Sequence, residues 1–143
     1  VDIPDEDFAD QPAAGVNSPA WIVGHLAVVA DMGARLLGGR MEFGDDWRMS
    51  FGPGSVPSPD RSSYPTKEEL LGAFEKASSR LRSAAAVAEP DRLDAPQPTK
   101  FFKAELPTVG DFAAHILTTH QMLHLGQLST WRRVKGLGSV LGI

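Results

Sequence analysis

Three long segments with helical periodicity and recognisable ends constrain the fold of this chain most strongly. In the first segment, Ser18 is a favourable N-cap and Pro19 suits the first position of a helix. Apolar residues then recur at helical spacing over 21–37, where a Gly-Gly pair ends the pattern. We therefore expect the first helix to end at Leu37.

The other two segments begin with equally clear signals. Thr66 to Glu69 is a capping box, and the amphipathic pattern that follows it continues to about Ala88. The third segment starts at the N-cap Thr108 and is expected to run as one helix to Lys135. These helices predict an all-α fold, in which residues 1–143 form one helical bundle domain.

Two connections, residues 38–65 and residues 89–107, are too long to be simple turns. Long connections in a compact helical domain often cover a functional site. Alternatively, their aromatic side chains close the ends of the core. The aromatic residues concerned are Trp47, Phe51, Phe101 and Phe102.

Composition excludes several classes of function. The chain has 143 residues, enough for one domain with a hydrophobic core, and contains no cysteine, so it has neither disulfides nor thiolate metal sites. Its formal net charge of −4 gives no electrostatic reason to expect binding to nucleic acid. No signal peptide and no membrane-spanning apolar run is evident. We therefore expect a cytoplasmic protein that binds neither nucleic acid nor membrane.

A pair of histidines four residues apart, His120 and His124, is the clearest functional signal. Residues at this spacing lie one turn apart on the same face of a helix, so both imidazoles can bind one metal ion. The neutral imidazole is the commonest protein ligand of zinc and also suits nickel, copper and iron. The pair still needs a further ligand from elsewhere in the chain.

Of the two remaining histidines, His25 is the better candidate for this ligand. On a continuous helix, His115 would lie roughly 140° around the axis from His120. His25 instead lies in a strongly apolar helical stretch, where a polar ring needs a partner once it is buried. A metal shared with the pair would provide that partner. Alternatively, His25 is a core histidine bonded to a backbone carbonyl.

Gln127 lies about one turn beyond His124, near the same helix face. Its amide could bond a metal-bound water or the far nitrogen of His25, which would fix the tautomer of that ring. The alternative is a hydrogen bond to a neighbouring side chain without any role at a metal. The sequence assigns no catalytic residue.

Two stretches of the chain resemble signature blocks of the DinB/YfiT-like superfamily of metalloenzymes. Residues 17–26, Asn-Ser-Pro-Ala-Trp-Ile-Val-Gly-His-Leu, resemble the first block. Residues 120–128, His-Gln-Met-Leu-His-Leu-Gly-Gln-Leu, resemble the second, in which two histidines precede a Gly-Gln pair. The resemblance spans nearly the whole chain. It implies an up-down-down-up four-helix bundle with a metal held by three histidines, here His25, His120 and His124.

The resemblance also implies a helix before the three described above. That helix should precede residue 1 and is missing, and residues 1–17 read instead as an extended lead-in. Three amphipathic helices would leave one apolar groove open, which soluble monomers rarely tolerate. We therefore expect either a fragment or processed chain, or a partner over the groove, most simply a second copy in a homodimer.

Characterised members of this superfamily include metal-dependent S-transferases and isomerases that use bacillithiol, mycothiol or glutathione. A metal held by three neutral imidazoles keeps open positions, where a thiol or a water can lose its proton. The leading hypothesis is an enzyme that transfers a small-molecule thiol to an electrophile. Zinc is the expected metal, with nickel, manganese or iron as alternatives. The other hypotheses are a metal-dependent hydrolase and a non-catalytic metal-binding or stress-associated dimeric module.

Overall fold

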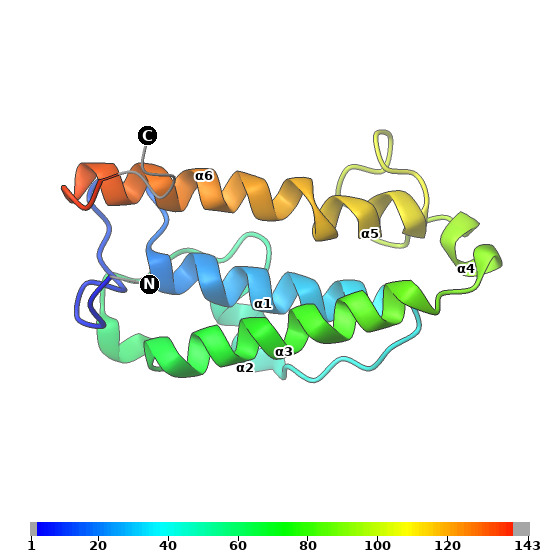
Figure 1. Cartoon of the computed structure of the whole chain (residues 1–143), viewed down its shortest axis with the longest axis horizontal. Coiled ribbons are helices and arrows are strands. Elements are labelled where there is room, and N and C mark those ends of the chain that lie inside the picture. The colour runs from blue at the N-terminus through cyan, green and yellow to red at the C-terminus, as the bar shows by residue number, and fades with distance from the viewer. Residues whose placement is uncertain (1–2, 139–143) are drawn as a thin grey trace.

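The computed structural model describes residues 3–138, which fold into helices and connecting turns without any strand (Figure 1). Three long helical segments lie side by side. They are α1 (Pro19–Leu36), α3 (Lys67–Ala86), and the consecutive pair α5 (Val109–Leu117) and α6 (Thr119–Val134). Shorter elements fill the connections: α2 (Asp45–Phe51), the 3-10 helix η1 (Arg61–Ser63) and α4 (Pro90–Asp94). The all-α fold is as predicted.

The three long helical segments run in the directions of the last three helices of the expected up-down-down-up order. In Figure 1, α1 and α3 run in the same direction, joined by a long crossover, and α5 and α6 return in the opposite direction. α1 contacts α2, α3, α5 and α6, and its most extensive packing is with α3. It is therefore the central element of the domain.

The predicted caps form as hydrogen bonds. Ser18 Oγ accepts from the backbone N–H of Trp21 at 3.3 Å. Thr66 and Glu69 form the reciprocal capping box at the start of α3, and Thr108 and Asp111 form a second one at the start of α5. Each cap satisfies N–H groups that have no partner within the helix, which explains why local sequence fixes these three starts.

The third predicted helix is not continuous, and this part of the prediction is wrong. Thr118, with φ −130° and ψ −85°, separates α5 from α6. Its Oγ1 donates to the carbonyl oxygen of Ala114 at 2.6 Å. Threonine hydroxyls that bond the preceding turn compete with the backbone ladder and bend helices. Two adjacent threonines at 118–119 make this the weak point of the segment.

The two long connections contain short helices that the sequence pattern did not indicate. α2 lies in the first connection and α4 in the second. Buried Asp31 fixes the start of the first connection, because its carboxylate accepts from the backbone N–H groups of Glu42 and Phe43. It also pairs with Arg80 of α3 at 2.7 Å.

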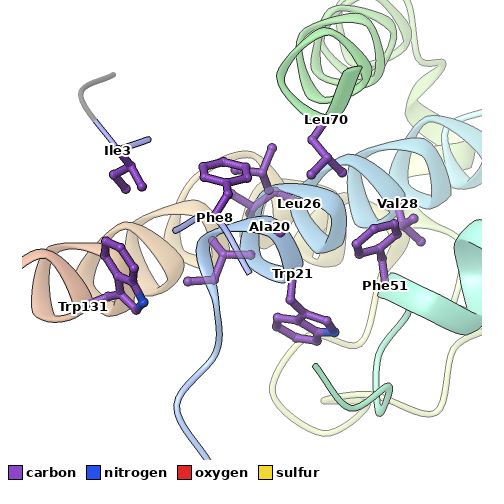
Figure 2. Close-up of a cluster of buried hydrophobic side chains, with 11 residues drawn as sticks. Ile3, Phe8, Ala20, Trp21, Leu26, Val28, Phe51, Leu70 and Trp131 are labelled. Atoms are coloured by element: carbon purple, nitrogen blue, oxygen red, sulfur yellow. The ribbon is translucent and has the colours of Figure 1, made fainter. Parts of the chain in front are cut away.

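The segment before α1, expected to be an extended lead-in, forms turns that close one end of the core. Ile3 and Phe8 are 1% and 2% exposed and lie in the hydrophobic cluster shown in Figure 2. Trp131 of α6 belongs to the same cluster, and its Nε1 donates to the carbonyl oxygen of Asp10 at 2.8 Å. This segment therefore joins the start of α1 to the end of α6.

None of the helices between residues 3 and 138 is both long enough and apolar enough to cross a membrane.

Candidate metal centre

Helices α1 and α6 bring three histidines into one cluster. His25 comes from the middle of α1, and His120 and His124 lie one turn apart on α6. One ring nitrogen of each lies within 4.8 Å of those of the other two. The ring centroids are 4.6 Å apart for His120 and His124, and 4.9 and 5.2 Å from His25 to His124 and His120. The structure thus brings together the three residues that the sequence selected as ligands.

His25 is held from two sides. Its Nδ1 lies 2.7 Å from the backbone carbonyl oxygen of Phe51, the last residue of α2. A carbonyl can only accept, so Nδ1 carries the proton and Nε2 keeps its lone pair for a metal. The ring also stacks on Trp21, with centroids 4.5 Å apart and planes 10° apart. From the sequence, a bond to a backbone carbonyl was the alternative to metal binding. In the structure this hydrogen bond also leaves Nε2 of His25 available to a metal.

His124 is oriented by Gln127. Its Nδ1 lies 2.9 Å from Gln127 Oε1, which also accepts from Asn17 Nδ2 at 3.2 Å. With the amide oxygen as the acceptor, Nδ1 of His124 donates and Nε2 is again left for a metal. The partner of Gln127 is thus its neighbour on α6, and the bond to His25 considered from the sequence does not form. The sequence did not identify Asn17, just before α1, as a residue that contacts the site.

His120 has a different environment. Its Nδ1 is buried and has no hydrogen-bond partner among residues 3–138. Buried polar atoms without a partner are rare in native proteins because they lose their hydration without compensation. If the imidazole binds a cation together with its two neighbours, that interaction compensates for the lost hydration. The donor set and this nitrogen therefore fit a bound metal.

Burial keeps the three rings neutral at pH 7. It lowers the pKa of His25 to about 4, against a smaller opposing effect of the bond to Phe51. Burial, reinforced by the neighbouring imidazoles, lowers the pKa of His120 to about 3. The pKa of His124 is lowered by burial as well. Metal ligation requires the neutral form of imidazole, so protons do not compete for these nitrogens near neutrality.

All four histidines of the chain line one pocket of about 350 Å³. His115 is not among the three whose ring nitrogens converge, but its ring lies beside that of His120. The break at Thr118 brings its ring centroid to 5.7 Å from that of His120. The 140° separation assumed from the sequence therefore does not apply here. His115 Nδ1 is bonded to Thr119 Oγ1 at 2.6 Å.

The aromatic residues of the two connections divide between the two roles considered from the sequence. Phe51 is 2% exposed and belongs to the core, and Trp47 packs between Phe51 and Phe43. Phe101 and Phe102 line the histidine pocket instead. The aromatic residues of the first connection therefore close the core, and those of the second lie over the site, where Pro53 and Gly54 of the first connection also line the pocket.

The chain is similar to a known protein family. The family model described as the DinB superfamily matches residues 1–128, which contain all four histidines. No curated protein and no solved structure matches the chain.

Proposed function

Because the chain belongs to the DinB superfamily, we propose that it is a metal-dependent enzyme that transfers a small thiol to an electrophile. His25, His120 and His124 would hold the divalent ion, which we expect to be zinc. The observation that carries the proposal is the convergence of three neutral imidazoles, two of which have Nδ1 engaged and Nε2 free. This is the ligand set of an open catalytic site, because three protein ligands leave room for a substrate.

When bound, a divalent ion supplies Lewis-acid activation of a thiol or of a water molecule at neutral pH. The protein's own residues determine where this can happen. The carbonyl of Phe51 and the amide of Gln127 orient two of the rings, and the aromatic residues around them limit access of water. In the transfer, a carbon–sulfur bond forms, the leaving group takes its bonding electrons, and the thiol proton passes to solvent.

Metal content tests the site directly. The purified protein should bind one zinc ion per chain, measured by elemental analysis and titration calorimetry. His120→Ala should abolish this binding but leave a helical circular dichroism spectrum, since the hydrophobic core carries the fold. His115→Ala is the matched control and should retain the ion. Full metal occupancy in the folded His120→Ala variant would refute the ligand assignment.

Activity tests the chemistry. The zinc-loaded protein should accelerate conjugation of glutathione, mycothiol or bacillithiol to 1-chloro-2,4-dinitrobenzene, and a chelator should remove the acceleration. A metal-loaded protein that accelerates none of these reactions would contradict thiol transfer. Hydrolysis of 4-nitrophenyl acetate under the same conditions would then favour the hydrolase, and inactivity in both assays the non-catalytic module.

We also propose that the chain forms a homodimer. Exposed apolar side chains lie along α6, with Met122, Leu125 and Val134 at 67%, 48% and 63% exposure. Burial of such side chains against a second copy would remove apolar surface from water. Sedimentation equilibrium should give twice the chain mass of 15.4 kDa. A monomer at micromolar concentration would contradict this.

A further inference from the structure

The walls of the histidine pocket are almost entirely apolar. α1 contributes Trp21 and Val29, the second long connection contributes Phe101 and Phe102, and α5 contributes Phe112. These side chains come from segments distant in the sequence, so the pocket exists only in the folded chain. Apolar walls of this kind are typical of sites that bind small molecules.

The pocket also lacks a partner for a charged substrate. Within the part of the chain that the structure describes, no Asp, Glu, Lys or Arg lines it. A charged group that enters such a site loses its hydration without compensation, apart from what the metal provides. Any charge on the electrophile that fills this pocket should therefore lie at the metal, and the rest of that molecule should be neutral.

Hydrogen bonds of Gln97 hold the part of the pocket wall formed by Phe101 and Phe102. Gln97 is 3% exposed, and its Nε2 donates to the carbonyl oxygen of Phe101 at 2.6 Å. Its Oε1 accepts from the backbone and hydroxyl of Thr99. Phe102 follows with φ of +51°, a left-handed conformation that is unfavourable for a bulky residue. Strained residues of this type often belong to functional sites.

Beyond the three proposed ligands, His115 is the polar side chain of the wall. Thr119 engages its Nδ1, so Nε2 is the ring nitrogen left for a ligand. The edge of the ring meets Phe102, with centroids 5.6 Å apart. A ligand between the histidine cluster and Phe102 would therefore meet aromatic surface and one hydrogen-bonding group.

We propose that this pocket selects a neutral, mainly apolar electrophile with a body of at least one aromatic ring, for which its volume of about 350 Å³ leaves room. This inference rests on the proposed function for the reaction and adds the substrate class. Charged electrophiles such as dicarboxylates are thereby disfavoured. Phe102, at 56% exposure on the rim, should contribute to selection.

Two matched pairs of probes test the inference. With zinc-loaded protein, benzohydroxamic acid should bind at least about tenfold more tightly than acetohydroxamic acid, because its ring removes apolar surface from water. 4-Carboxybenzohydroxamic acid should lose most of this gain. With metal-free protein, benzamide should bind more tightly than acetamide, as followed by nuclear magnetic resonance of the Trp21 indole.

The variants locate the effect. Phe102→Ala should reduce the ratio between the two hydroxamates severalfold. Val87→Ala, an exposed position at the end of α3 outside the pocket, should leave the ratio unchanged. Equal affinities within each pair, or no loss with the carboxylated probe, would overturn the inference. Metal content of the same samples separates the two proposals: without bound zinc the proposed function fails, and the amide pair still decides the substrate class.

Discussion

The two helices that provide the histidine cluster have opposite surroundings. In α1, 15 of 18 residues are buried, whereas only His124, Trp131 and Arg132 are buried among the 16 residues of α6. His25 is therefore part of the core of the molecule, and His120 and His124 lie on a helix that is largely open to solvent. Substitutions in α1 should affect stability first, and substitutions in α6 should affect the site first.

The largest effect is expected at Gly24, the glycine of the first signature block. A Cβ on Gly24 of α1 would overlap the ring of Phe51, which is 2% exposed and packs against Trp47 and Tyr64. We expect Gly24→Ala to lower the free energy of unfolding by about 3 kcal/mol, since overpacked cores shift side chains and backbone. Denaturant titration measures the change. Zinc affinity should fall as well, because Phe51 also holds His25. A loss below about 0.5 kcal/mol would contradict the packing argument.

In the metal-free protein, the buried histidine of α1 should make the free energy of unfolding decrease in acid. The pKa of His25 is about 4 in the folded state and about 6.5 in an unfolded chain. The unfolded state therefore binds more protons between these values, and stability is complete above pH 6.5 and declines toward pH 4. From His25 alone we expect a loss on the order of 2 kcal/mol between pH 7 and pH 4.5. His25→Gln should make this part of the profile shallower, while His120 and His124, whose pKa values burial also lowers, keep the rest of the slope. An equally steep decline in that variant would argue against a contribution from His25.

On α6, a change next to the ligands should affect the metal more than the fold. Gln127→Leu removes the oxygen that accepts from His124. Partners of this kind change metal affinity by roughly tenfold to a hundredfold, and we expect a loss of that size in zinc titrations. Gln121→Leu on the same helix is the matched control and should bind zinc normally. Equal affinities in the two variants would reduce Gln127 to a surface residue.

The smallest effect is expected at the glycine of the second block. A Cβ on Gly126 would meet no atom within 4 Å. Because alanine favours a helix more than glycine does, Gly126→Ala should raise stability by about 0.5 to 1 kcal/mol and leave zinc affinity unchanged. Thermal denaturation beside Gly24→Ala makes the comparison. A loss of stability as large as in α1 would mean that this face of α6 is covered in solution.

Several features could be predicted because their causes are local in sequence. The cap of α1 at Ser18, the capping box at Thr66 and the N-cap at Thr108 join residues three apart, so the pattern contains both partners. The pair His120 and His124 is fixed by the helical repeat alone. His25 was selected because a polar ring in an apolar helix needs a partner, and the structure provides both a carbonyl and the two other histidines.

Other features depended on the tertiary structure. The carbonyl of Phe51 reaches His25 only because the first long connection folds back over α1, and Asn17 reaches Gln127 only because α1 packs beside α6. His115 enters the pocket because two threonines interrupt a helix whose apolar pattern reads as continuous. The sequence alone thus determined which helices form and which histidines share a face, since these follow from hydrogen bonds and spacing within one turn. Only the packing of distant segments decided how each ring is oriented and what surrounds it.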